Sequence, residues 1–100
     1  MLKSGDADVA FIFTTDGDLA GGEYAILDDD KKFFPPYNIT FAIRNEALKN
    51  LGPEGQKVIE DVQKPLTEKV MRELNARVDI DKQKPEAAAA SYLKQAGFVK

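Results

Sequence analysis

Two aromatic residues stand where an apolar run meets a stiff or polar turn, and both are candidates for binding a ligand. Phe13 closes the apolar run that begins at Val9, directly before the polar turn TTDG at 14–17. Tyr37 follows the diproline at 35–36, directly before the next apolar run. Because proline fixes φ and turn residues fix the chain direction, rings at such points suit the wall of a pocket. We therefore expect Phe13 and Tyr37 to face one ligand.

The residues alone leave structural roles open for these rings. Phe13 could equally be the last core residue of a buried strand, because aromatic side chains dominate protein cores. Tyr37 could stack on its neighbouring prolines. Phe33 and Phe34 fit packing at a hinge better than contact with a ligand. Asp16 fits a turn-forming residue whose side chain accepts a hydrogen bond from its own backbone.

The composition removes most catalytic and metal chemistry. The 100 residues include no cysteine and no histidine, which excludes disulfides, thiol nucleophiles, zinc sites of the usual kind and the commonest general base. The run DDDKK at 28–32 fits a solvated loop, because a calcium site needs further oxygen ligands at loop spacing. No nucleophile, base and third orienting group occur together. We expect no enzyme, no catalytic residue, no metal site and no cofactor.

Charge and hydropathy narrow the class of partner. The net charge is -3, and residues 1–36 carry eight acidic residues and three lysines. No segment is basic enough for a nucleic-acid footprint, so we expect no nucleic-acid partner. No apolar run approaches the roughly 20 residues of a membrane span, and the first four residues are not a signal peptide.

Hydrophobic periodicity predicts an α/β chain of about three strands followed by three to four helices. The strands are expected at 8–14, 24–27 and 38–44, with a turn of helix at 18–20 ended by Gly21-Gly22. The helices are expected to follow in this order: 46–51 capped by Asn45 and ended by Gly52, 53 to before Pro65, one capped by Thr67, and one opened by Pro85 and ended at Gly97-Phe98, with an extended interlude at 78–81.

The first strands have the composition of strands that are buried on both faces. A sheet of that kind needs more strands and more helices than 100 residues supply. The chain also enters a buried-type strand with no preceding element. We therefore expect a fragment of an α/β protein that begins in the middle of its fold.

Three stretches carry a resemblance to a known family: ADVAFIFTTDG (7–17), AILDDDKKFFPPYN (25–38) and LTEKVMRELNARVDIDKQKPEAAAASYLKQAGF (66–98). They resemble the C-terminal part of the substrate-binding proteins of ABC importers for glycine betaine, choline and related osmoprotectants. The resemblance runs from about Gly5 to Phe98. It implies a partial lobe of the periplasmic-binding-protein type II fold.

The resemblance also implies a division of the chain and a location. Residues 1–34 would end the second lobe, 35–37 would be the crossing or hinge segment, and 38–100 would be the C-terminal part of the first lobe. The first two-thirds of a family member, including its signal peptide, would be absent here. The full-length protein would be extracytoplasmic, either periplasmic or a cell-surface lipoprotein.

By resemblance, the site is an aromatic box around a quaternary ammonium. Tyr37 matches a box tyrosine, and Phe13 falls where members often have tyrosine. Phenylalanine keeps the ring face that attracts a cation, an interaction of about 0.5–2 kcal/mol, and lacks the hydroxyl. Thr14 is placed to touch the ligand. The expected ligand-binding residues are Phe13, Thr14 and Tyr37, and the resemblance implies a transporter permease as the protein partner, with 28–32 as a candidate surface.

Two alternatives to this function stay open. One is a structural lobe that binds no ligand and forms a homo-oligomer by exchanging elements with a second copy, because unpaired strand edges are adhesive. The other is a binding protein of the same family for a different small molecule.

Overall fold

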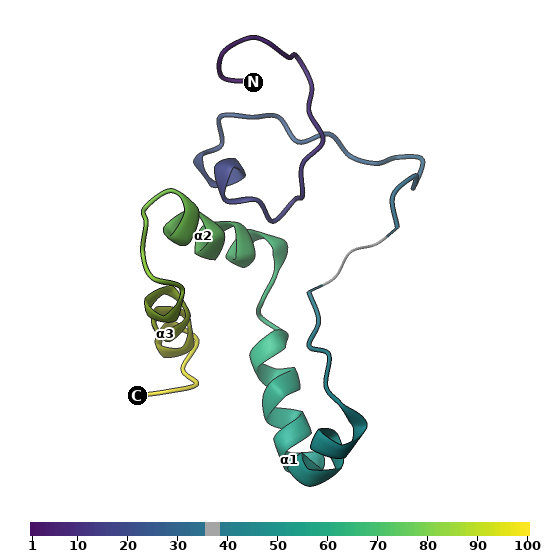
Figure 1. Ribbon diagram of the computed structural model, residues 1–100, viewed down its shortest axis with the longest axis vertical. Coiled ribbons are helices and arrows are strands. Elements are labelled where there is room, and N and C mark those ends of the chain that lie inside the picture. Colours follow the sequence, from purple (N-terminus) through teal and green to yellow (C-terminus); the bar gives the residue numbers. More distant parts are fainter. Residues whose placement is uncertain (36–38) are drawn as a thin grey trace.

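The computed structural model describes residues 1–35 and 39–100 of the chain. The first half is mostly irregular, with one short 3-10 helix, and the second half is helical (Figure 1). The regular elements are the 3-10 helix η1 (Gly17–Gly21) and the helices α1 (Asn45–Gln63), α2 (Glu68–Asp79) and α3 (Pro85–Gln95).

The α/β prediction is wrong for the residues that the structure describes. Residues 1–35 and 39–100 contain no strand, and the segments 8–14, 24–27 and 39–44 are irregular. A strand forms only by exchanging backbone hydrogen bonds with a neighbouring strand, and these three segments form no such ladder with one another. The apolar composition of 9–13 satisfies the side-chain preference of a strand, but composition cannot supply the pairing partner.

The helical half agrees better with the sequence prediction. α1 contains a break at Gly52, whose φ of 66° and ψ of 178° lie outside the helical region, and Pro53 follows it. The predicted end of one helix at Gly52 and start of another at Pro53 is thus observed as a kink. The cap prediction is wrong by one residue, because Asn45 is already helical and Arg44 occupies the capping position without a side-chain hydrogen bond.

The two later helices begin where the sequence predicted. The Thr67 side chain accepts a hydrogen bond from the Val70 amide at 3.3 Å, which caps α2, and Pro85 opens α3. The Phe98 amide donates to the Leu93 carbonyl at 2.9 Å, which closes α3 as expected.

The extended interlude predicted at 78–81 is wrong through Ile80, which is the C-cap of α2 and has right-handed helical φ and ψ. Val78 and Asp79 belong to α2, and the Ile80 amide still donates to the Ala76 carbonyl at 2.9 Å. Each residue added to an existing helix gains one backbone hydrogen bond, so continuing the helix outweighs the weak preference of valine for extended structure.

α2 is the central element of the fold. It packs against η1 on one side and against α3 on the other (Figure 1). Among the described residues the buried apolar side chains are Leu19 of η1 and Ala88 of α3, one on each of these two partners. The Tyr92 hydroxyl of α3 donates to the Val62 carbonyl of α1 at 3.0 Å. The Cα radius of gyration is 16.9 Å, against about 13 Å for a compact 100-residue domain, so the molecule is elongated.

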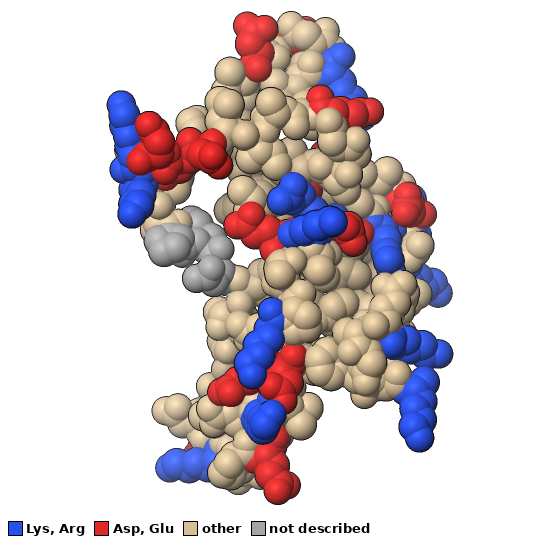
Figure 2. All heavy atoms as spheres, turned by 180° about the vertical axis from the view of Figure 1, so that it is seen from behind, with Lys and Arg blue, Asp and Glu red and all other residues tan. Residues whose placement is uncertain are grey.

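Acidic and basic side chains are interspersed rather than separated on the face seen in Figure 2. Along α1, Asp61 pairs with Lys57 at 2.5 Å and with Lys64 at 2.9 Å. The side-chain hydrogen bonds to Lys57 and then to Lys64 hold the pKa of Asp61 below its usual value. Within the described part of the chain, no helix is both long and apolar enough to cross a membrane.

Candidate functional site

The turn at 13–17 is organised by its own backbone and by Asp16. The Asp16 amide donates to the Phe13 carbonyl at 3.0 Å, and the Leu19 amide donates to the Asp16 carbonyl at 3.1 Å. The Asp16 carboxylate accepts from the Asp18 amide at 3.2 Å and so caps η1. The prediction that Asp16 forms the turn is confirmed.

The turn is fixed to α2 by a close backbone approach and by one long-range hydrogen bond. Gly17 is buried so tightly against α2 that an added Cβ would lie 2.7 Å from the Ala76 nitrogen. The Asn75 side-chain amide donates to the Thr15 carbonyl at 2.7 Å. Leu19 of η1 is also buried, with 7% of its surface exposed. The sequence predicted no role for Asn75, because a contact across 60 residues leaves no local pattern.

The predicted site residues that the structure describes lie at the outer end of this anchored turn. Phe13 is 68% exposed, and Thr14 next to it is exposed as well. The alternative that Phe13 is a core residue is therefore wrong in the described fold. Tyr37 and most of the predicted crossing segment at 35–37 lie outside the described residues, so the pairing of Phe13 with Tyr37 stays a prediction.

Three further rings form a contacting group that was not predicted from the sequence. Phe11 and Phe34 meet edge to face with ring centroids 5.8 Å apart, and Phe33 and Phe34 do so at 5.1 Å. Phe11 is 92% exposed and Phe33 81% exposed. The sequence could have indicated Phe11, because residues i and i+2 of an extended segment point to the same side, and Phe11 stands two residues before Phe13. Phe33 and Phe34 pack against each other, and their expected place at a hinge stays a prediction.

Asp29 holds the loop that carries Phe33 and Phe34. Its carboxylate oxygens accept hydrogen bonds from the Phe34 amide at 2.8 Å and from the Phe33 amide at 3.0 Å. These backbone donors, that of Phe34 first, lower the pKa of Asp29 from its usual value of 3.8. Lys32 in the same loop has a left-handed φ of 52°. The 28–32 run is exposed, as predicted, but one of its carboxylates has a structural role that a charge pattern does not reveal.

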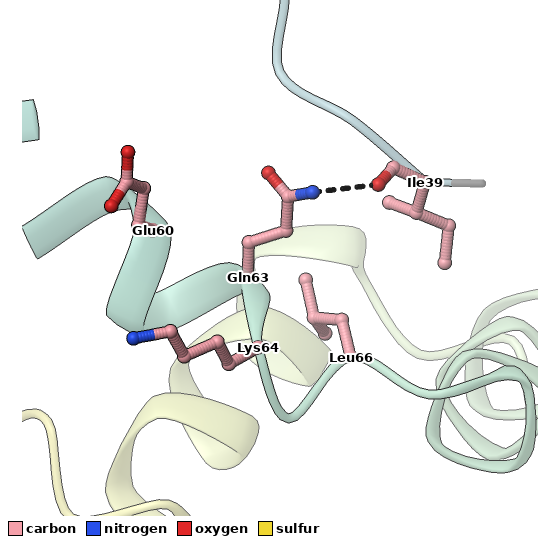
Figure 3. A pocket seen from close by; sticks show the side chains of 5 residues that line it. All are labelled: Ile39, Glu60, Gln63, Lys64 and Leu66. Carbon is pink, nitrogen blue, oxygen red and sulfur yellow. Dashed lines mark hydrogen bonds between the residues drawn. The ribbon is translucent and has the colours of Figure 1, made fainter. Parts of the chain in front are cut away.

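A depression on the surface is drawn in Figure 3, and neither Phe13 nor Thr14 is among the residues that line it. It is lined by Ile39, Glu60, Gln63, Lys64 and Leu66 at the end of α1. The Gln63 amide donates to the Ile39 carbonyl at 2.8 Å, so this polar group already has a partner within the protein (Figure 3). We assign no ligand to this depression.

Within residues 1–35 and 39–100, no group of three or more carboxylates could hold a metal ion. On α2, the Nε of Arg72 is buried and forms no hydrogen bond with any described residue. The chemical groups that the turn at 13–17 offers to a ligand are the exposed Phe13 ring and the Thr14 hydroxyl, with the exposed rings of Phe11 and Phe33 elsewhere on the surface.

Comparison with known proteins places the chain in a class of binding proteins. The family model for the substrate binding domain of the ABC-type glycine betaine transport system matches residues 1–95. The chain belongs to this family, which confirms the resemblance found in the sequence.

Three curated relatives have names that describe binding or transport. The chain is 35% identical over 94 residues to the glycine-betaine-binding protein of Pseudomonas aeruginosa, covering 94% of the chain and 30% of the relative. It is 34% identical over 87 residues to the ergothioneine transport permease/ergothioneine binding protein EgtU of Helicobacter pylori, covering 87% and 16%. It is 32% identical over 97 residues to the carnitine transport binding protein OpuCC of Listeria monocytogenes, covering 97% and 31%.

The chain therefore spans at most about a third of the length of these relatives. No solved structure gave a significant match.

Proposed function

We propose that this chain contributes part of the solute site of an extracytoplasmic binding protein. The complete protein captures a quaternary-ammonium solute and delivers it to the permease of an ABC importer. It catalyses no reaction. The observation that carries the proposal is the exposed ring of Phe13 at the end of a turn fixed to α2, in a chain of the glycine betaine substrate-binding family.

The proposed solute class is the betaines. Glycine betaine, carnitine and ergothioneine, the solutes in the names of three relatives, each carry a trimethylammonium group and a carboxylate. A trimethylammonium is a permanent, weakly hydrated cation, which favours contact with aromatic ring faces. Phe13 supplies such a face and Thr14 a hydroxyl beside it, and we propose Tyr37 as the second ring. Choline, which has the cation without the carboxylate, is the informative comparison.

The test is a titration of the ¹⁵N-labelled chain with glycine betaine, carnitine, ergothioneine and choline, followed by two-dimensional NMR. Glycine, which lacks the methyl groups, is the negative control. Saturable shifts at residues 13–17 with a trimethylammonium solute but not with glycine are the expected result. Phe13→Leu should weaken binding about twofold to thirtyfold, because a cation–π contact is worth about 0.5–2 kcal/mol. Phe98→Leu, at the far end of the chain, is the matched control. Spectra that do not change with any of the four solutes would overturn the proposal.

A second function is favoured by one specific observation, the number of large apolar side chains left exposed. Val9, Phe11, Leu27 and Phe33 are each at least 74% exposed. Exposed apolar surface of this kind favours association. In this alternative the chain is a structural lobe that pairs with a second copy and binds no solute. Light scattering during size-exclusion chromatography separates the two functions, since a dimer without any solute response supports the alternative.

A further inference from the structure

The bond from Asn75 to Thr15 joins the middle of α2 to the turn that follows Phe13. The donor–acceptor distance is 2.7 Å, and the bond is partly shielded from solvent. Phe13 and Thr14 are both exposed, so burial in a core does not fix where they lie. The backbone that follows them is one determinant of their placement, and Thr15 and Gly17 are the points where this backbone is attached to α2.

We infer that Asn75 is a positioning residue of the solute site: its amide, by fixing the Thr15 carbonyl, sets where the Phe13 ring and the Thr14 hydroxyl lie. The inference rests on the proposed function, because it concerns residues of that site. Asn75 itself is not assigned any contact with the solute.

The chemistry requires an amide at this position. A carbonyl oxygen can only accept a hydrogen bond, so its partner must donate through N–H or O–H. Asparagine donates through Nδ2 at neutral pH, whereas an ionised aspartate of the same shape presents only acceptors and would repel the carbonyl. Leaving a half-buried carbonyl without its donor costs free energy and lets the turn move away from α2.

The experiment uses ¹⁵N spectra and solute titrations of the full chain as wild type, Asn75→Ala and Asn75→Asp. Gln63→Ala is the matched control for loss of an amide bond, because Gln63 also donates to a backbone carbonyl, that of Ile39 at 2.8 Å, outside the 13–17 turn. Both asparagine variants should shift the amides of 14–17 and weaken glycine betaine binding about threefold to tenfold, the equivalent of one net hydrogen bond. Gln63→Ala should leave the amides of 14–17 in place.

Asn75→Asp gives a readout that a merely structural loss would not show. As pH falls toward about 4, the ordinary pKa of an aspartyl carboxyl, protonation restores an O–H donor and binding should recover relative to wild type at the same pH. Asp16 and Asp18 on the facing turn are present in wild type and variant alike, so the comparison with wild type at each pH removes any effect of their carboxyls. Asn50→Asp, on the exposed surface of α1, should show no such recovery.

Each outcome decides between the two ideas. If wild type binds glycine betaine and Asn75→Ala binds it equally well, the positioning role is overturned and the proposed function stands. If the amides of 14–17 do not move in Asn75→Ala, the positioning role is also overturned. If wild type binds no solute, the proposed function fails and takes the inference with it.

Discussion

Replacing Gly17 with alanine is expected to destabilise the fold, because the new methyl group would collide with the backbone of α2. The added Cβ would lie 2.7 Å from the Ala76 nitrogen and 2.9 Å from the Ala76 Cα, where ordinary contact begins at 3.4 Å. Both atoms belong to the main chain of a helix, so neither can rotate away. η1 and α2 must therefore separate by the difference between 3.4 and 2.7 Å, about 0.7 Å.

A separation of this size affects the main tertiary contact of η1. A gap of about 0.5–1 Å forfeits a quarter to a half of the dispersion energy between facing atoms. It would also loosen Leu19, one of the few buried apolar residues, and lengthen the bond from Asn75 to Thr15. Overpacking of this kind typically costs about 1–3 kcal/mol, and we expect Gly17→Ala to lower the free energy of unfolding by that amount.

The measurement is urea unfolding followed by circular dichroism at 222 nm, which reports on the helices. Gly21→Ala is the matched control, because it lies in the same 3-10 helix and its added Cβ would meet only the Glu23 Cγ at 3.9 Å. The control should be neutral or more stable than wild type by about 0.4–1 kcal/mol, since alanine restricts the unfolded chain. Equal stability of the two variants would refute the close approach of Gly17 to α2.

Three further changes test single interactions. Lowering pH below 3.8 should shift the NMR signals of the Phe33 and Phe34 amides. Because the pKa of Asp29 is lowered in the folded chain, its hydrogen bonds to these amides are present above pH 3.8 and are lost as pH falls through the folded-state pKa. Asp29→Asn should abolish this response. Tyr92→Phe should cost about 0.5–1.5 kcal/mol in urea unfolding, because the Val62 carbonyl loses its donor. Thr67→Ala should cost about 1 kcal/mol through loss of the α2 cap, measured in the same way.

Each of these changes has a control in the chain. Asp30→Asn should leave the acid shift intact, Tyr24→Phe should unfold like wild type, and Thr40→Ala in an exposed segment should be neutral.

Burial raises the pKa of Tyr92, so the stabilisation from its hydroxyl is present below its usual pKa of 10.0 and lost as pH rises through the higher folded-state pKa. An alkaline unfolding transition that Tyr92→Phe leaves unchanged would contradict that assignment.

The helices could be predicted because their signals are local. Thr67 caps α2 through the amide of Val70, only three residues later, and Pro85 suits the first turn of α3. The break in α1 follows from the neighbouring residues Gly52 and Pro53. The cap at Asn45 was misplaced by one position, and α2 ran on through Val78. Both errors concern an end of an element, where helices fray and boundaries shift by one or two residues.

The strands could not be predicted in this way, because a strand is a relationship between two segments. Residues 9–13 have a strand's composition, and the described chain gives them no ladder. The candidate site shows the same division. Phe13 and Thr14 were predicted from their place beside a turn, and they stay predictions. Phe11 and Asn75 take part through contacts with residues far along the chain. Asp29 acts over only four or five residues, but a charge pattern does not reveal that its carboxylate accepts from backbone amides.

Motifs and hydrogen bonds that span only a few residues were enough to predict the family, most of the helices and the turn at 14–17. Tertiary packing sets the exposure of Phe13, the close approach of Gly17 to Ala76 and the hydrogen bond from Asn75 to Thr15. The last two features join residues that are far apart along the chain. A contact between residue 15 and residue 75 depends on how every intervening element packs, and no local spacing encodes it.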